Sequence, residues 1–424
     1  MEAPVRIENR AQLIYLLTEA AELEHGVMCS YMFAAFTMKR RASEGLTEEQ
    51  AATVRRWRGV IMHVAIQEMT HMCLACNLLT AVGGAPHVRR PNMPSSHRAY
   101  GPGFSLELAP FNRDTIETFV FIERPESQET GSTQGENTSL PSLSSGNFSD
   151  IFSSERRYQT IGHLYRGVED GFRYLTQKYG EEGLFIGPPK AQIIEKYFNL
   201  PGLIPVTGLE SAIAAIQAIV EQGEGARVED ENAHYARFVA ILNEYDEILK
   251  VDPDFEPGRR VLKNPYSIYP NDILDATSVN LIDDPVTMDV CNLFDGCYEL
   301  LVQLLGRLLM GNEETEAQRT LIADVTVAIM LDVIGPLGDV ITTLPAGPSY
   351  PGFNAGPSFR FSRDGYTPPH MVAAWSLFIE RMKELSAYCG LIQGDDELKA
   401  VLNRVSRSLA QYAEQLGKPE VAAV

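Results

Sequence analysis

The chain has 424 residues, of which 45% are hydrophobic and 22% charged, as expected for a globular protein that can bury a sizeable core. Its net charge of −20, without any basic cluster, argues against a nucleic-acid partner, because phosphate binding needs grouped Lys and Arg side chains. We expect no membrane span, since no run approaches about 18 apolar residues, and six cysteines without a leader-like N-terminus favour free thiols in the cytoplasm.

Two long helices are predicted in the first part of the chain. Apolar side chains recur every three to four residues between positions 8 and 38, which is typical of an amphipathic helix. The same spacing returns from Thr47 to Gly83, where Thr47 and Gln50 form a candidate capping box. Because the connection is short, the two helices should pack antiparallel.

The periodic pattern stops between residues 84 and 154. Within this stretch we expect residues 126–150, which are rich in Ser, Thr and Gly, to form a mobile loop, because they bury too little apolar surface to offset the entropy of ordering. A third helix is predicted from Ile161. A fourth runs from Leu209 to Ile248 and is broken by the glycine-containing segment 222–225.

A proline-rich segment, residues 252–270, separates this region from a second helical one. Periodicity there predicts helices near residues 284–310, 315–343, 370–389 and 393–417. The fold class is therefore all-α, with a helical bundle in residues 1–252 and a C-terminal helical domain in residues 253–424.

Three of the predicted helices place acids or histidines on their apolar stripes. Glu24 is in line with the apolar residues of the first helix, and Glu68 and His71, three residues apart, share the stripe of the second. Glu-x-x-His is the ligand spacing of di-iron carboxylate bundles, and Glu231 and His234 repeat it on the fourth helix. A metal site is the favoured interpretation; buried acid–histidine pairs without metal are the alternative.

The remaining ligand is ambiguous. Glu224 is aimed closer to the apolar stripe than Glu221 if the fourth helix continues so far, and a helical bulge at the flanking glycines would bring it toward His234. The alternative is a glycine cap with two solvated glutamates. Glu169 lies beside the stripe of the third helix and His163 on its opposite face, so both are weaker candidates.

Several motifs, in this order, resemble the ferritin-like domain of the iminophenylpyruvate dimer synthase family. They include AAELEHGVMCSYMFAAFTMK, IQEMTHMCLACNLL, FIERPE, TIGHLYRGVEDG and AIVEQGEGARVEDENAHYARF, and later YSIYPND and LPAGPSYPGFNAGPSFRF. The resemblance implies a ferritin-like four-helix bundle, and it assigns metal ligation to Glu24, Glu68, His71, Glu224 and His234. The family often has a glutamate at the position of His163, which implies an altered ligand set in this chain.

The resemblance to enzymes of violacein and indolocarbazole biosynthesis implies an iron-dependent oxidase or oxidative-coupling enzyme of secondary metabolism, acting on a small amino-acid-derived molecule. The cofactor would be iron, as a di-iron or mononuclear centre, with manganese or zinc as alternatives. A non-catalytic iron-binding protein and a metal-free helical scaffold are the rival hypotheses. A small-molecule substrate is the expected partner, and a homo-oligomer stays open.

Overall fold

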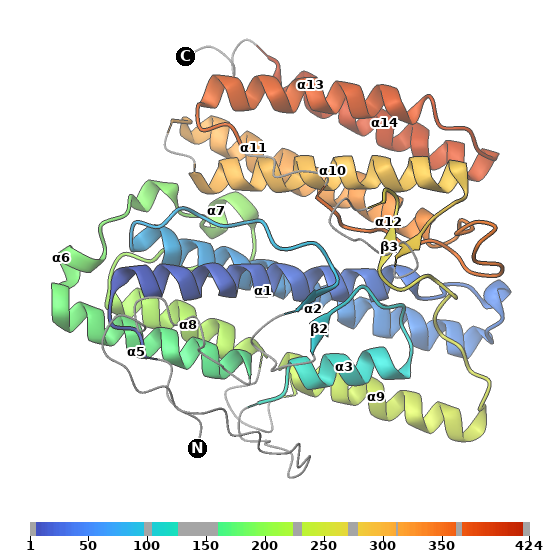
Figure 1. Ribbon diagram of the computed structural model, residues 1–424, viewed down its shortest axis with the longest axis horizontal. Coiled ribbons are helices and arrows are strands. Elements are labelled where there is room, and N and C mark those ends of the chain that lie inside the picture. The colour runs from blue at the N-terminus through green and yellow to red at the C-terminus, as the bar shows by residue number, and fades with distance from the viewer. Residues whose placement is uncertain are drawn as a thin grey trace.

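The computed structural model describes residues 6–96, 104–125, 160–223, 231–269, 279–310, 313–361 and 367–418, which form stacked layers of helices (Figure 1). The central layer is the predicted antiparallel pair, α1 (Arg10–Thr37) and α2 (Glu48–Ala81). Arg10 donates to the carbonyl oxygen of Val82 at one end of the pair (2.6 Å), and Arg58 donates to that of Ala35 toward the other (3.1 Å). The predicted all-α class is confirmed.

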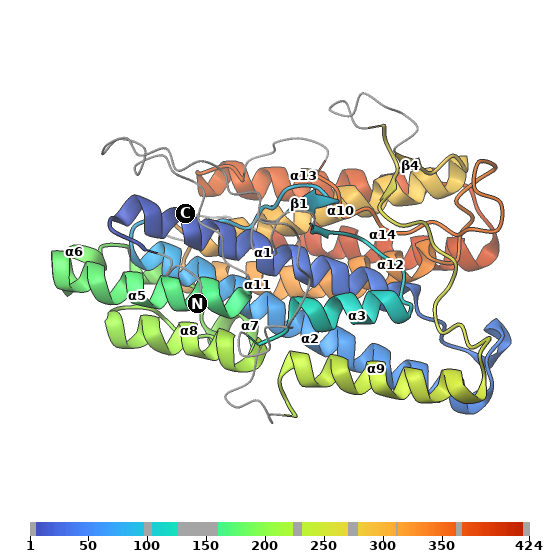
Figure 2. The same ribbon diagram turned by 60° about the horizontal axis from the view of Figure 1, so that its bottom comes forward.

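The second layer completes a four-helix bundle with helices that lie end to end. Beneath one half of the central pair lie α5 (Ile161–Tyr179) and α8 (Leu209–Gly223), and beneath the other half lie α3 (Arg113–Ile122) and α9 (His234–Val251) (Figure 1, Figure 2). The break between α8 and α9 agrees with the interruption expected at the glycine-containing segment. Four helix ends therefore meet near the middle of the bundle.

Helix α3 corrects the sequence interpretation, which placed no helix between residues 84 and 154. Asn112 caps it by accepting a hydrogen bond from the backbone N–H of Thr115 (2.8 Å), and Ile116, Phe119 and Ile122 lie three residues apart on its buried side. The helix has only 10 residues, so its apolar pattern repeats too few times to be recognised within proline-rich sequence.

The C-terminal helices form a third layer on the opposite side of α1 and α2 (Figure 1). They are α10 (Pro285–Met310), α11 (Glu316–Ile329), a π-helical turn (Met330–Ile334), α12 (Gly335–Ile341), α13 (Met371–Cys389) and α14 (Asp396–Leu416). Because α1 lies between two layers, it is buried on most of its surface, and the expectation of a one-sided amphipathic helix is wrong for it.

The remaining described elements are short. They are the 3₁₀ turns η1 (Ala42–Glu44) and η3 (Pro189–Ala191), the helices α6 (Glu181–Leu184) and α7 (Glu195–Phe198), the antiparallel strands β1 (Ser95–Ser96) and β2 (Ser105–Leu106), and the parallel strands β3 (Pro265–Tyr266) and β4 (Asn280–Leu281).

One helical stretch corrects the expectation that no segment has the character of a membrane span. By length and composition alone, Glu316–Ile341 is apolar enough to cross a membrane, and 50% of its most apolar window is buried inside the protein. Core helices of water-soluble proteins have the same character, so the stretch is weak evidence for a membrane span.

The apolar core is continuous between the layers and marks no division between residues 252 and 253. The domain boundary there stays a prediction. The loop predicted at residues 126–150 lies outside the described residues.

Candidate metal centre

Helix α1 places Glu24 at the centre of the bundle. The side chain is 1% exposed, and its Oε1 atom accepts a hydrogen bond from the Tyr165 hydroxyl on α5 (2.7 Å). Burial raises the pKa of Glu24 well above its ordinary value, and the negative charge of Glu68 raises it further. Glu24 therefore favours its protonated form unless a cation compensates its charge.

Helix α2 supplies Glu68 and His71 from consecutive turns, as their spacing predicts. Nδ1 of His71 lies 3.0 Å from Oε2 of Glu68, and Nε2 of His71 lies 3.0 Å from Oε1 of Gln222 on α8. Burial would raise the pKa of Glu68, but the positive charges of His71 and His234 outweigh burial and lower it. Both ring nitrogens of His71 thus have hydrogen-bond partners in this structure.

The first residue of α9, His234, is a fourth predicted ligand that lies beside the others. Its side chain is fully buried, and its Nδ1 atom lies 2.8 Å from Oε1 of Glu68 and 3.6 Å from Oε2 of Glu123. Burial lowers the pKa of His234, but these two carboxylates outweigh burial and raise the pKa to about 9. The rings of His71 and His234 are stacked, with centroids 5.4 Å apart.

Glu123 is a site residue that the residue-by-residue reasoning missed. It follows directly after α3, is 4% exposed, and accepts a hydrogen bond from the hydroxyl of Tyr31 on α1. The motif FIERPE contains it, but without α3 nothing in the sequence indicated that this glutamate points inward. The Asn112 cap and the apolar residues spaced by three were the available signal.

The other predicted ligands are placed differently. Glu231 and Glu221 are exposed, so the second Glu-x-x-His pair does not contribute its glutamate to the cluster. Glu169 is paired with Arg173 on the side of α5 (2.6 Å). His163 is buried on α5 but does not belong to the group of close donor atoms found among the described residues, and Glu224 lies outside those residues.

We call Glu24, Glu68, His71, Glu123 and His234 the candidate metal centre. One donor atom from each of Glu68, His71 and His234 lies within 4.8 Å of the other two. Within the described part of the chain, both ring nitrogens of His234 and Oε1 of Glu68 lack a partner with hydrogen-bond geometry, although the two groups are only 2.8 Å apart. This close but unbonded approach of Glu68 to His234 fits a shared cation, and a set of carboxylate and imidazole ligands suits iron, manganese or zinc.

The negative charges of the buried carboxylates also favour the binding of a cation. Three carboxylates, those of Glu24, Glu68 and Glu123, are buried together, and like charges in a low dielectric are strongly unfavourable without compensation. The raised pKa values of Glu24 and His234 indicate that protons supply this compensation in the metal-free chain. A bound metal would displace those protons.

Known proteins resemble this chain over most of its length. A family model described as ferritin-like matches residues 17–243. Dichlorochromopyrrolate synthase of Lentzea aerocolonigenes is 26% identical over an alignment of 420 residues, which covers 91% of this chain and 40% of that protein. The 2-imino-3-(indol-3-yl)propanoate dimerase of Chromobacterium violaceum is 24% identical over 375 residues, covering 84% of this chain and 34% of that protein.

The chain thus spans less than half the length of these two curated relatives. A solved structure of a ferritin-like protein from Caulobacter vibrioides superposes with a TM-score of 0.47 and 18% identity, covering 78% of this chain and 95% of that one. The resemblance predicted from the sequence motifs is confirmed by the family model and by both relatives.

Proposed function

Because the chain belongs to the ferritin-like family, we propose that it is a metal-dependent oxidase or oxidative-coupling enzyme acting on a small amino-acid-derived metabolite. The observation that carries the proposal is the convergence of three buried carboxylates and two buried imidazoles at the junction of α3, α5, α8 and α9. The names of the two relatives, a synthase and an imino-acid dimerase, support this class of reaction and substrate.

The chain's own residues would hold and orient the metal ligands. Glu24 and Glu123 are each fixed by a tyrosine hydroxyl, and the His71 ring is fixed through Nε2 by Gln222, so that Nδ1, beside Glu68, would be the nitrogen that binds the metal. Such outer contacts set the direction and basicity of a ligand. We propose iron as the metal, with manganese and zinc as alternatives; bound there, iron would supply the redox chemistry for oxidation by dioxygen or peroxide.

The burial of the centre also bears on its chemistry. The cavity beside it has a volume of only about 10 Å³, and Ile122, Ile161 and Ile219 line it together with the site's own charged groups, so bulk water is kept away from the ligands. In the metal-free chain, Glu24 can hold its proton on Oε2, because Oε1 accepts from Tyr165. Metal binding would displace this proton, so that Oε2 could act as a ligand while Oε1 keeps its hydrogen bond from Tyr165.

We also propose a cytoplasmic location and a small-molecule substrate. All six cysteines are free and buried, which agrees with a reducing compartment. Association of the chain into a homo-oligomer stays a prediction.

The test is the metal content and oxygen consumption of the full chain purified without chelator. We expect bound iron and, with an aromatic imino acid generated in place by an amino-acid oxidase, more oxygen consumption than the oxidase and its amino acid show without this chain. Glu68→Gln keeps the side-chain size but removes the charge between His71 and His234, so it should lower metal occupancy about tenfold or more. Glu221→Gln, at an exposed position near the end of α8, should leave occupancy unchanged.

Each outcome separates the rival hypotheses. Tightly bound iron without oxygen consumption beyond that of the oxidase would favour an iron-binding protein over an enzyme. No metal after reconstitution with iron, manganese or zinc would favour a metal-free scaffold and would overturn the proposal. Equal metal loss in both variants would mean that the metal is bound elsewhere.

A further inference from the structure

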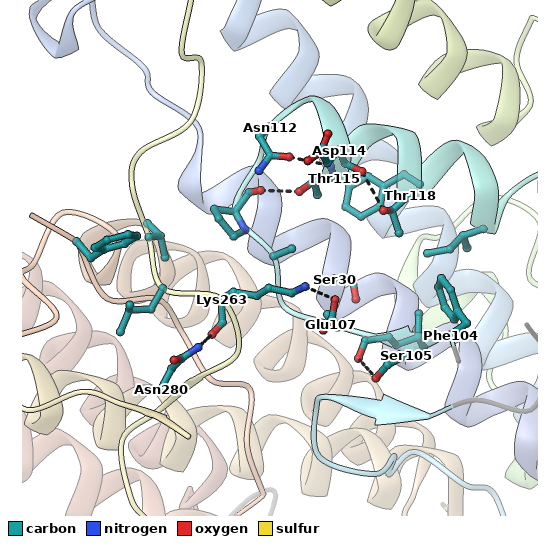
Figure 3. A pocket seen from close by; sticks show the side chains of 18 of the residues that line it. Ser30, Phe104, Ser105, Glu107, Asn112, Asp114, Thr115, Thr118, Lys263 and Asn280 are labelled. Atoms are coloured by element: carbon teal, nitrogen blue, oxygen red, sulfur yellow. Dashed lines mark hydrogen bonds and ion pairs between the residues drawn. The ribbon is translucent and has the colours of Figure 1, made fainter. Parts of the chain in front are cut away.

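A second cavity lies on the side of α3 that faces away from α9. It has a volume of about 560 Å³, is partly open to solvent, and is lined by α3, by the segment around β2 and by two loops near residues 261–263 and 350–353 (Figure 3). Cavities of this size hold small organic ligands in many proteins. The metal ligands of the candidate centre are not part of its wall.

This cavity and the space beside the candidate metal centre share one lining side chain. Ile122 lines both the cavity and the space beside the centre, and the next residue, Glu123, belongs to the centre. On α1, Ser30 lines the cavity while its neighbour Tyr31 donates to Glu123. A ligand in the cavity would therefore lie against the same two helices that position the centre.

The wall of the cavity combines aromatic rings with groups that form hydrogen bonds. Phe104, Phe119, Tyr350 and Phe353 supply the rings. Hydroxyl and amide side chains supply most of the neutral polar groups, which Figure 3 shows around the cavity: Ser30, Ser105, Asn112, Thr115, Thr118 and Asn280. The wall also holds two carboxylates, those of Asp114 on α3 and Glu107.

Lys263 is the only basic side chain in the described wall. Its ammonium group extends to the carboxylate of Glu107 (Figure 3), and its backbone carbonyl accepts from the Asn280 amide (2.5 Å). The side chains of Lys263 and Glu107 are 50% and 36% exposed, so the ion pair is solvated and a competing carboxylate can reach the ammonium group. Glu107 thus occupies the place that an anionic ligand would take.

We infer that this cavity binds a small aromatic carboxylate, with the rings of the wall packing against the aromatic group and Lys263 contacting the carboxylate. That this ligand is the substrate or product of the adjacent centre rests on the proposed function. The binding itself does not, because none of the wall residues is a candidate metal ligand.

The experiment is calorimetric titration of the full chain with indole-3-propanoate, a stable carboxylate that has no amine to oxidise. Lys263→Met removes the charge and keeps the apolar stem, and should weaken binding about tenfold, the size expected for one charge-assisted contact. Glu107→Gln removes the competing carboxylate and should tighten binding about threefold, the size expected for a solvated ion pair. Opposite effects at the two positions cannot come from a general loss of folding.

The matched control is Lys250→Met. Lys250 is also an exposed lysine in an ion pair, with Glu247 on α9, and it lies outside the cavity wall. Its replacement should not change binding. Indole-3-ethanol tests the need for the carboxylate and should bind about tenfold more weakly than the acid.

Three results would overturn the inference. They are no binding of indole-3-propanoate, equal binding of the alcohol and the acid, or tighter binding of the amine tryptamine, which would mean that the acidic residues dominate. Repeating the titration with Glu68→Gln separates the two proposals. If Glu68→Gln loses metal but still binds indole-3-propanoate, the cavity binds its ligand independently of the metal. If the wild-type chain binds metal but not indole-3-propanoate, the inference about the cavity fails and the proposed function stands.

Discussion

At the residue scale, several hydrogen bonds surround the buried carboxylates that the structure describes. Outside the candidate metal centre, Asp295 on α10 is an example. It is 9% exposed and accepts hydrogen bonds from the Ser358 and Ser267 hydroxyls and from the backbone N–H of Arg360. Burial raises the pKa of Asp295 to about 6, although these hydrogen bonds lower it in part.

This raised pKa predicts a pH-dependent contribution to stability. The folded chain holds the Asp295 proton more tightly than the unfolded chain, so the stabilisation is fully present below about pH 4 and is lost as the pH rises through about 6. Asp295→Asn is neutral throughout. Between pH 4 and pH 8 its free energy of unfolding should therefore rise relative to wild type by up to about 3 kcal/mol.

Urea unfolding at several pH values measures this difference. Asp324→Asn, at an exposed position on α11, is the control and should follow the wild-type profile. A constant difference between Asp295→Asn and wild type across the range would show that Asp295 is ionised at all these pH values.

At the element scale, the central layer and the C-terminal helices come into close contact at a glycine that has no side chain to separate them. Gly338 on α12 lies against the ring of Phe36 on α1, and a Cβ atom there would be 2.6 Å from the nearest ring atom. Phe36 is 1% exposed and stacked on Phe359, so its ring has little room to move. The contact therefore sets the spacing between the central layer and the C-terminal helices.

Two alanine substitutions should have opposite effects for this reason. Gly338→Ala should lower the free energy of unfolding by about 1–3 kcal/mol, because it overpacks a filled interface. Gly59→Ala, on the exposed side of α2 with no heavy atom within 4 Å of the added Cβ, should raise it by about 0.5–1 kcal/mol through helix propensity. Denaturant titration of both variants measures the two changes, and a neutral Gly338→Ala would mean that the layers can separate at little cost.

At the scale of the whole molecule, the C-terminal helices are part of one core with the bundle. Tyr298 on α10 contacts α1 through His25 (2.6 Å) and Cys29 (3.3 Å). Arg259, in the connecting segment, donates to Glu44 (2.7 Å) and to the hydroxyl of Thr342 (3.0 Å), which joins the loop between the first two helices to the end of α12. The apolar core is continuous across these contacts.

We therefore expect the bundle and the C-terminal helices to unfold together. The two tryptophans report on them separately, since Trp57 lies on α2 and Trp375 on α13. The single-tryptophan variants Trp57→Phe and Trp375→Phe should each show a fluorescence midpoint equal to the circular-dichroism midpoint of the same sample. Fluorescence midpoints that differ from those of circular dichroism would indicate that the two regions unfold independently.

The sequence by itself determined the helices and much of the candidate centre. Hydrophobic periodicity is a local property, so the long helices appeared in their places, and the positions of Glu24, Glu68 and His71 on those stripes predicted that they point inward. The break before α9 was marked by its glycines. Membership of the ferritin-like family was visible in the order of the motifs.

Only the tertiary structure determined which other residues lie beside Glu24, Glu68 and His71. Glu123 meets His234 across more than 100 positions of sequence because α3 ends where α9 begins, and no local pattern encodes that meeting. Glu231, although three residues from His234, is turned to the surface because α9 starts only at His234, so helical spacing does not apply to the pair. Periodicity along one helix specifies a direction, whereas the partners in that direction depend on how distant segments pack.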